Sequence, residues 1–443
     1  MKTVLVAGAG KSSSYLIDYL LVNAKQNWRV IIMDADASSI NEKLNGNPKG
    51  EAAVIDLNEK DKRQALVGKA DLVISLLPPR FHHILAEDCI KYKKHMITAS
   101  YVSPEMMSLN DKAKEAGVMF MCEMGLDPGI DHMSAMQIFN GIYKIAGEVT
   151  SFRSSCGGLV APESDDNPWH YKMTWNGRNI ISAGKLGAKW IEKGKTYEVG
   201  YEDLFKTFRK AKFPTLNKNL VSYPNRDSLK YQELYNLENV KTFQRSTIRP
   251  LSFMRAWQVV IDADLTNEVD AFDMLETTFT DWLSSKTGLP NDDNLRNAFQ
   301  EKYKIDAKDM KMFDWLRIFE NRPIYMEGTK SSAEILQYLF ENRLQLNVMD
   351  KDMILMQHEV DYSRRGVNYS LTSSLVVKGE NKVFSAMSKT VGMPMALLAE
   401  RILTNRFDPT TLTGIQIPII PEVYNPILRD LEKNGIEFIQ HVT

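Results

Sequence analysis

The sequence is short of cysteine, of net charge and of long hydrophobic runs, and each shortage argues against a class of protein. Three cysteines occur in 443 residues without a CxxC pair, which argues against a disulfide framework and a structural zinc site. The 55 Lys and Arg residues nearly balance the 56 Asp and Glu residues, which argues against a nucleic-acid or membrane-surface partner. No apolar run approaches the length of a membrane span and no leader precedes the first strand, so we expect a cytoplasmic protein that acts on a small molecule.

Short apolar segments alternate with helix-like segments along the first third of the chain. The strand-like segments lie at residues 3–7, 29–33, 52–57, 71–77, 95–99 and 118–122. Strands joined by helices are typical of a parallel, doubly wound sheet, so the sequence predicts an α/β fold of the Rossmann type. The ligand of such a sheet is expected at the carboxyl ends of its strands.

The pattern changes after about residue 145. Further strands are predicted at residues 149–156, 170–175 and 242–249, helices between 267 and 344, and a hairpin over 354–363 and 368–377. Amphipathic segments at 386–403 and 422–435 predict helices that pack back on the first domain. We therefore predict a dinucleotide-binding domain over residues 1–130, completed by about 390–443, and an inserted α+β domain over 131–389.

A glycine-containing turn follows the first strand and opens a helix. Gly8 and Gly10 match a dinucleotide fingerprint, with Ser13 in place of its third glycine. The second strand ends in Asp34, about 20 residues downstream, where a carboxylate can accept hydrogen bonds from an adenosine ribose. These features favour a bound NAD, although Asp34 and Asp36 could instead only cap the next helix.

The segment 118–136 turns a buried strand into a helix. Asp127 occupies the position expected of the helix N-cap, and Pro128 that of the first helical residue, an arrangement that favours anionic ligands. Capping would keep Asp127 ionised, whereas burial would raise its pKa. We expect capping to win, so that Asp127 orients the substrate or a water instead of acting as the base. The alternative is a well-capped helix without chemistry.

Other side chains near predicted strands have both a functional and a structural interpretation. Tyr101 would offer a hydroxyl to the site, but a lone tyrosine more often packs with its hydroxyl on the backbone. Cys156 precedes two glycines that permit close approach of a ligand, yet a buried inert cysteine is the commoner case. The seven histidines show no metal-ligand spacing, so we expect no metal site.

Arginines of the second domain could bind a substrate with two or three carboxylates, because guanidinium groups donate two parallel hydrogen bonds. Four candidates lie beside turns or strands, and the sequence does not choose among them: Arg178, Arg226, Arg245 and Arg249.

Several motifs follow one another along the chain: SLLPP, ASYVSPEM, GLDPGIDHMSA, SSCGG, NPWHYKMTWNGR and YPNRDSL. Together they resemble saccharopine dehydrogenase of the L-glutamate-forming type. The resemblance implies a Rossmann domain completed by the C-terminal segment and an inserted α+β domain that binds substrate and dimerises. It also implies reversible oxidation of saccharopine to L-glutamate and 2-aminoadipate 6-semialdehyde by a homodimer that acts on an amino-acid substrate.

The glycine turn and the resemblance together give the expected site residues. The cofactor-binding positions are Gly8, Gly10, Lys11, Ser12, Ser13, Ser14, Asp34, Asp56, Leu77, Ser100, Leu126, Asp127, Pro128 and Trp175. The substrate-binding positions are Ser100, Tyr101, Asp127, Cys156, Arg226, Thr247 and Arg249. The candidates for proton transfer are Asp127, Tyr101 and Cys156.

The chain departs from the family after the second strand. Fungal members carry a basic residue there, suited to a 2′-phosphate, whereas this chain has Asp34 and Asp36. We therefore expect NAD to be favoured over NADP, because a carboxylate at the ribose would repel the phosphate.

Two other functions stay open. A carboxynorspermidine or carboxyspermidine dehydrogenase would perform the same imine chemistry but would need carboxylates, not arginines, in the distal pocket. A non-catalytic NAD-binding sensor is the other alternative, and the combination of Tyr101, Asp127, Cys156 and Arg226 argues against it.

Overall fold

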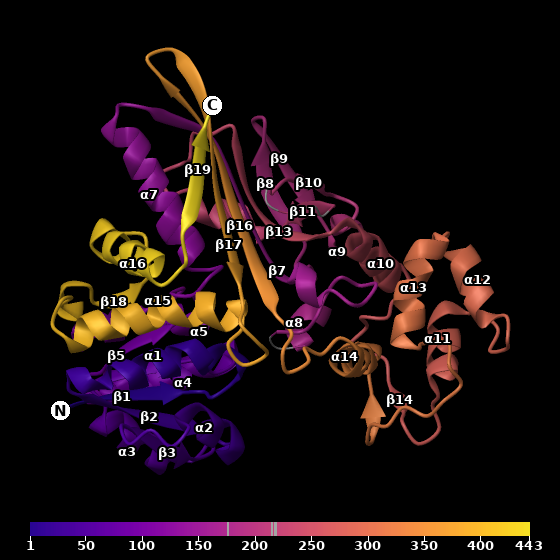
Figure 1. The fold of residues 1–443 in the computed structure, drawn as a ribbon, viewed down its shortest axis with the longest axis horizontal. Coiled ribbons are helices and arrows are strands. Elements are labelled where there is room, and N and C mark those ends of the chain that lie inside the picture. The colour runs from indigo at the N-terminus through magenta and orange to yellow at the C-terminus, as the bar shows by residue number, and fades with distance from the viewer. Residues whose placement is uncertain (175–176, 214–215, 217–218) are drawn as a thin grey trace. The chain divides into compact units, whose positions relative to one another are not determined.

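The computed structural model describes residues 1–443 except 175–176, 214–215 and 217–218, and it divides the chain into two compact units (Figure 1). The first unit comprises Met1–Val149, Tyr362–Tyr369 and Leu375–His441. The second comprises Thr150–Asp361, Ser370–Ser374 and Val442–Thr443. The functional domain boundaries expected from the sequence stay a prediction, since a compact unit is not by itself a functional domain.

The first unit is built on a parallel sheet. Among the described residues its strands are β1 (Lys2–Ala7), β2 (Trp28–Asp34), β3 (Gly50–Val54), β4 (Leu72–Ser75), β5 (His95–Thr98), β6 (Met119–Met121) and β18 (Gly414–Gln416). They lie in the order β18-β6-β5-β4-β1-β2-β3, and every neighbouring pair is parallel. The predicted doubly wound sheet is confirmed. The order reverses between β1 and β4, and the carboxyl ends of these strands hold the turns discussed below.

Continuous burial along β1 reflects helices that cover both faces of this sheet. Leu5 and Ala7 pack with apolar residues of α3 (Lys60–Lys69), α4 (His82–Tyr92), α5 (Pro104–Met107) and α6 (Asn110–Glu115). Val4 and Val6 point the other way and are also fully buried. On that second face, α15 (Ala386–Leu403) contacts α1 (Ser14–Val22), β4 and β5 (Figure 1).

Close packing of α15 against α1 depends on a small residue. A Cβ added at Gly392 would lie 3.1 Å from the backbone nitrogen of Leu16, so a larger side chain would push the helices apart. The other helices of this unit are α2 (Ala37–Leu44), α7 (Ile130–Lys144) and α16 (Pro421–Lys433). The helix predicted over residues 386–403 is confirmed, whereas the single helix predicted over 104–116 is two helices, α5 and α6.

The second sheet is mixed. Its strands among the described residues are β7 (Glu148–Val160), β8 (Ala188–Glu192), β9 (Lys195–Val199), β10 (Arg209–Ala211), β11 (Leu220–Pro224), β12 (Arg226–Asp227), β13 (Thr242–Pro250), β16 (Asp352–Arg364), β17 (Val367–Lys378) and β19 (Phe438–Val442). The main order is β10-β11-β13-β7-β16-β17-β19. The hairpin expected near residue 365 is confirmed as β16 and β17, and its turn residues Arg365 and Gly366 have φ angles of 50° and 80°.

An aromatic core, centred on Trp169, Trp257 and Phe340, fills the helical part of the second unit. The elements are α8 (Gly177–Ile181), α9 (Tyr201–Leu204), α10 (Leu251–Asp262), α11 (Phe279–Thr287), α12 (Leu295–Lys302), α13 (Ala307–Leu316) and α14 (Ser332–Arg343), with a two-stranded ladder of β14 (Phe272–Asp273) and β15 (Thr329–Lys330). The α+β character expected of this region is confirmed.

The strand predicted over residues 170–175 is wrong for the described residues 170–174, which form a loop with a single β-bridge at Met173. Asn167 holds this loop, because its side-chain oxygen accepts from the Trp169 N–H at 3.0 Å and its nitrogen donates to the Tyr171 carbonyl at 3.1 Å. The alternation of apolar and polar residues therefore reflects a pinned, buried loop.

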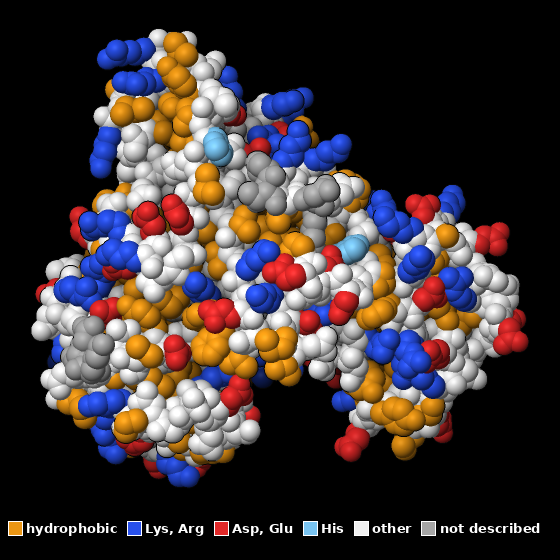
Figure 2. Space-filling view, in the orientation of Figure 1, with side chains coloured by type: hydrophobic (Ala, Val, Ile, Leu, Met, Phe, Trp, Pro, Cys, Tyr) orange, Lys and Arg blue, Asp and Glu red, His pale blue; other side chains and the backbone are white. Residues whose placement is uncertain are grey.

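The surface agrees with the balanced composition. Acidic and basic side chains are interspersed over the face drawn in Figure 2. None of the helices in the described ranges combines the length and the hydropathy that a membrane crossing requires.

Candidate functional site

The turn after β1 has the local structure of a dinucleotide-binding loop. Gly8 has a φ of 108°, and a Cβ there would lie 2.9 Å from the carbonyl carbon of Leu76. Around Gly10 the position of a Cβ is open. The turn continues through Lys11–Ser13, a short 3₁₀ helix, into α1, and the hydroxyl of Ser14 at the start of α1 is buried without a hydrogen-bond partner among the described residues. A tight turn, an open approach and an unsatisfied hydroxyl fit a phosphate group at this helix start.

Asp34, the last residue of β2, is engaged by the backbone of its own region. One carboxylate oxygen accepts from the Ala9 N–H at 2.7 Å and the other from the Asp36 N–H at 3.0 Å. Asp36 is the N-cap of α2 and accepts from the Ser38 N–H and the Ser39 hydroxyl. These hydrogen bonds, that of Ser39 first, lower the pKa of the Asp36 carboxyl. Asp36 thus caps the next helix, as the alternative left open by the sequence has it, whereas Asp34 anchors the backbone of the glycine turn and of the loop before α2.

Tyr101 and Asp127 meet at the carboxyl ends of β5 and β6. The Tyr101 hydroxyl donates to a carboxylate oxygen of Asp127 at 3.0 Å, and both side chains are half-buried. The alternative in which the Tyr101 hydroxyl bonds only to backbone therefore does not describe this residue.

The predicted N-cap at Asp127 is wrong. Helix α7 begins at Ile130, and its N-cap is Gly129, with a φ of 144°. The start of the helix is stabilised by a residue of its own first turn, since the Gly129 N–H donates to the side chain of Asp131 at 2.6 Å. The peptide between Asp127 and Pro128 is cis, and the Gly125 N–H donates to the Pro128 carbonyl at 3.0 Å. Asp127 therefore lies in a tight loop before the helix, and its carboxylate does not cap α7.

Two buried histidines that sequence reasoning missed support the segment 100–102. His82, the first residue of α4, bridges Ser75 and Ser100, with nitrogen–oxygen distances of 2.8 Å to each hydroxyl. His132 lies 2.8 Å from a carboxylate oxygen of Glu123, whose other oxygen accepts from the Val102 N–H at 3.1 Å. Isolated histidines have no spacing signal, although His132 does lie inside the GLDPGIDH motif.

Strand register in the second unit brings three polar side chains into one row. Thr247 on β13 is paired with Cys156 on β7 and with Tyr223 on β11. Directly paired residues project from the same face of a sheet, so these three share one face, together with Arg249 two residues along β13. Burial raises the pKa of the Tyr223 hydroxyl, against the opposing charge of Arg249, so this group stays protonated. Tyr223 is a further residue that the sequence did not single out.

Arg249 is a buried guanidinium, with 9% of its surface exposed. One of its nitrogens donates to the Ile248 carbonyl at 2.9 Å and to the Gly158 carbonyl at 3.4 Å. The guanidinium carbon lies 5.5 Å from the ring centre of Tyr171 and 5.8 Å from that of Phe253. Among the residues that the structure describes, no carboxylate forms an ion pair with Arg249.

The other three arginines have different surroundings. Arg226 on β12 is exposed and has a φ of 54°. Arg245 is 6% exposed and stacks over the ring of Tyr231 at 4.5 Å. Arg178 forms a surface ion pair with Glu268 at 3.0 Å. Burial without a paired acid thus distinguishes Arg249 from Arg178, a choice the sequence could not make.

The remaining expected positions are scattered. Asp56 is exposed in the turn after β3 and accepts from the Asn58 N–H at 2.7 Å. Leu77 is half-buried after β4, and Leu126 and Pro128 are buried beside Asp127. Trp175 lies outside the described residues.

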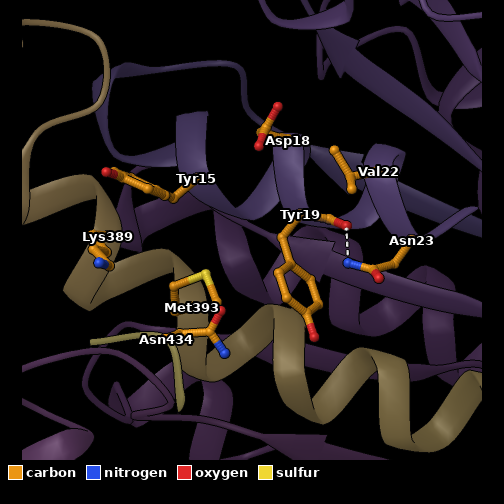
Figure 3. A pocket seen from close by; sticks show the side chains of 8 residues that line it. All are labelled: Tyr15, Asp18, Tyr19, Val22, Asn23, Lys389, Met393 and Asn434. Carbon is orange, nitrogen blue, oxygen red and sulfur yellow. Dashed lines mark hydrogen bonds between the residues drawn. The ribbon is translucent and has the colours of Figure 1, made fainter. Parts of the chain in front are cut away.

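Two surface hollows lie away from these residues. One, of about 200 Å³, lies between α1, α15 and the end of α16, and Figure 3 shows Tyr19 within it, its carbonyl accepting from the Asn23 amide at 2.9 Å. The other, of about 440 Å³, is lined in the second unit by residues of α10, of the segment after α9 and of the loop from α12 into α13. Neither hollow is lined by an expected site residue. Within the described ranges, no group of three or more His, Cys, Asp or Glu residues could hold a metal ion.

Curated relatives align with the whole chain. It is 30% identical to the saccharopine dehydrogenase [NADP(+), L-glutamate-forming] of Saccharomyces cerevisiae, over 98% of both chains. It is 29% identical to the protein of the same name from Schizosaccharomyces pombe, over 100% of this chain and 99% of the relative. It is also 32% identical to the mitochondrial alpha-aminoadipic semialdehyde synthase of Bos taurus, but spans only 48% of that longer protein.

A solved structure shares the fold over its full length. The apo, histidine-tagged saccharopine dehydrogenase (L-Glu forming) from Saccharomyces cerevisiae superposes with a TM-score of 0.89 at 28% identity, and each chain is covered completely. The likeness therefore includes both sheets and the turns that connect them.

The prediction that NAD is favoured over NADP was wrong. Residues 4–121 match a family model described as the saccharopine dehydrogenase NADP binding domain, and the fungal relatives are named as NADP(+) enzymes. The physical reason lies in the contacts of Asp34, since both of its oxygens accept backbone hydrogen bonds within the loops. A carboxylate used in this way is a loop anchor and does not report which ribose is bound.

This role of Asp34 predicts how its variants bind cofactor. Asp34→Ala removes the acceptor for the Ala9 N–H and should raise the Kd of NADP and NAD by a similar factor, about 10-fold for lost support of the phosphate turn. Asp34→Asn keeps one acceptor oxygen and should lie between the wild type and the alanine variant. Fluorescence titration of both cofactors measures this, and a change in the ratio of the two Kd values would contradict the anchor role.

The larger, C-terminal part of the chain matches a second family model. Residues 125–436 match the saccharopine dehydrogenase C-terminal domain, and with the NADP binding domain this match accounts for almost the whole sequence. The motifs, the fold and the full-length relatives agree, and the chain belongs to the saccharopine dehydrogenase family.

Proposed function

We propose that this protein is an oxidoreductase that acts on the CH–NH bond of saccharopine with NADP, giving L-glutamate and 2-aminoadipate 6-semialdehyde in a reversible reaction. The relatives that align over their whole length bear the name of this activity. The observation that carries the proposal is Arg249, because a buried guanidinium without a described acidic partner matches a substrate rich in carboxylates.

The turn after β1 is the proposed cofactor site. The open space at Gly10 and the unsatisfied Ser14 hydroxyl support pyrophosphate binding there, with Lys11, Ser12 and Ser13 beside them. When bound, the nicotinamide supplies the acceptor for the hydride that leaves the carbon bearing the secondary amine.

The proposed substrate-binding residues fall into two sets, one in each unit. Ser100, Tyr101 and Asp127 belong to the first unit, where the Tyr101–Asp127 hydrogen bond places a donor beside a carboxylate. Cys156, Arg226, Thr247 and Arg249 belong to the second unit, and we add Tyr223 because it is paired with Thr247. Arg249 binds a substrate carboxylate with its forked donors.

Proton movement falls to Asp127 and Tyr101. The substrate amine must lose a proton before its C–H bond gives up the hydride, and Asp127 is the acceptor. Water then adds to the imine, and the carbinolamine collapses with release of the glutamate amine, which takes up a proton. Tyr101 donates a hydrogen bond to Asp127 and so stabilises the carboxylate before it accepts the proton.

Steady-state assays test the proposal directly. The purified protein should reduce NADP in the presence of saccharopine and release L-glutamate, identified by mass spectrometry. Carboxynorspermidine serves as the comparison substrate and should not be turned over, because Arg249 provides a cation where a polyamine needs an anion. Turnover of the polyamine alone would establish the related dehydrogenase, and turnover of neither would support the non-catalytic sensor.

We also propose that the enzyme is a cytoplasmic homodimer. The three cysteines are buried thiols outside any disulfide, which is compatible with a reducing compartment. Light scattering coupled to size-exclusion chromatography gives the mass in solution, and a monomer at micromolar concentration would contradict the dimer. Cell fractionation tests the location.

A further inference from the structure

A buried chain of hydrogen bonds links two neighbouring strand ends of the first unit. Ser75 ends β4 and Ser100 follows β5, and these strands are parallel neighbours. The His82 ring lies between them, with Nδ1 2.8 Å from the Ser75 hydroxyl and Nε2 2.8 Å from the Ser100 hydroxyl. Nε2 is also 3.3 Å from the hydroxyl of Thr98. A residue from α4 thus fixes the side chain that begins the segment carrying Tyr101.

The surroundings of His82 suit orientation and not proton delivery. Its exposed fraction is 1%, and that of Ser75 is 0%, so the chain ends in the core and not in solvent. Burial, reinforced by the charge of His83, lowers the pKa of His82 to about 4. At neutral pH the ring therefore has one N–H donor and one acceptor nitrogen, and each serine hydroxyl complements one of them.

The segment 100–102 is held on its other side by Glu123. The Glu123 N–H donates to the Ser100 carbonyl at 3.1 Å, and its side chain accepts from the Val102 N–H at 3.1 Å. Glu123 is in turn 2.8 Å from His132, which is fully buried. Glu123 therefore sets the backbone of the segment, while His82 sets the Ser100 hydroxyl.

We propose that His82 is a positioning residue of the reaction, which acts through Ser100 to fix the hydrogen-bonding direction of that hydroxyl toward bound ligand and to hold Tyr101 in reach of Asp127. The inference rests on the proposed function, because Ser100 and Tyr101 are its proposed substrate-binding residues. The Ser100 hydroxyl can both donate and accept a hydrogen bond. The His82 ring takes one of these two roles, and the other remains for the ligand.

Two amide variants of His82 distinguish the positioning role from a role in core packing alone. In His82→Gln the amide reaches the place of Nε2 and keeps the contact with Ser100, whereas in His82→Asn it reaches only the place of Nδ1 and keeps the contact with Ser75. We expect His82→Asn to lower kcat/KM for saccharopine about 10- to 100-fold, since small misplacements of reacting groups have effects of this size. His82→Gln should stay within about 3-fold of the wild type. The Kd of NADP should change little in either variant.

A double-mutant cycle with Ser100→Ala tests whether His82 acts through that residue. The loss in kcat/KM for His82→Asn combined with Ser100→Ala should be no larger than for Ser100→Ala alone. His83→Gln, the neighbouring position on α4, is the control and should leave kcat/KM unchanged. In ¹⁵N-histidine NMR spectra of the wild type, the His82 ring should show a single neutral tautomer from pH 8 to pH 5, and Ser100→Ala should shift its Nε2 resonance.

The outcomes distinguish the inference from the function on which it rests. If the wild type does not oxidise saccharopine, the proposed function fails, and the inference fails with it. If the wild type is active but the two amide variants are equally impaired, or the cycle is additive, the inference alone is overturned. Should either variant not fold, the Ser100→Ala shift at Nε2 and the remaining amide variant decide the question.

Discussion

Arg249→Met is expected to raise the KM for saccharopine about 100-fold or more while leaving the melting temperature unchanged or slightly higher. The guanidinium is buried, and it donates to two main-chain carbonyls. A buried charge without a paired acid is destabilising by itself, and the rings of Tyr171 and Phe253 offset this only in part. Methionine has a comparable length and packs well against aromatic rings, so the fold loses little.

Arg255 provides the matched control in the same unit. Its guanidinium makes a bidentate pair with Asp309, at 2.6 and 3.0 Å, and Asp309 is 4% exposed. Arg255→Met leaves that buried carboxylate without its partner. The free energy of unfolding should therefore fall by about 1–3 kcal/mol, while the KM for saccharopine stays the same. A raised KM with unchanged stability in Arg249→Met, beside an unchanged KM with lowered stability in Arg255→Met, would distinguish a binding arginine from a structural one. If Arg249→Met lowered the melting temperature and left KM unchanged, Arg249 would be structural.

Arg249→Lys refines the same test. Lysine keeps the positive charge but presents a point donor on a flexible chain, so it cannot make two parallel hydrogen bonds to a carboxylate. A KM between those of the wild type and the methionine variant would indicate that charge and geometry both contribute.

Periodic patterns in the sequence predicted most of the strands and helices of the first unit. Apolar runs of strand length gave β1 through β6, and the helix expected over residues 386–403 was confirmed as α15. These predictions succeed because burial on both faces of a parallel sheet leaves a strong local signal. The strand predicted over residues 170–174 was wrong because a local pattern can also arise without a strand. Asn167 holds a buried loop there, and the polar and apolar residues of that loop alternate.

Residues that act through distant partners had no such signal. His82 meets Ser75 and Ser100, and Glu123 meets Val102, only after strands from different parts of the chain align. The expectation for NAD failed similarly, because the sequence shows the carboxylate of Asp34 but not that the Ala9 N–H already occupies it. Local patterns predict elements well, whereas the use of a polar side chain depends on what tertiary structure brings to it.

The tertiary contacts of Asp127 also change what we expect of this residue. A helix cap would keep this carboxylate from accepting a proton only if Asp127 were the N-cap, and that position belongs to Gly129. Asp127 instead accepts the hydroxyl of Tyr101 at 3.0 Å from a half-buried position. We therefore expect Asp127 to accept the proton of the substrate amine, and not merely to orient the substrate.

Asp127→Asn tests this role with little change in shape. The amide oxygen of asparagine still accepts from the Tyr101 hydroxyl, so the loop should persist while the basic group is lost. We expect kcat to fall about 100-fold or more and the acidic limb of kcat/KM against pH to disappear. Asp131→Asn, the same exchange four residues along the chain, should retain the acidic limb, because its oxygen continues to accept from the Gly129 N–H. An acidic limb that survives in Asp127→Asn would assign the proton to another group and restore the orienting role.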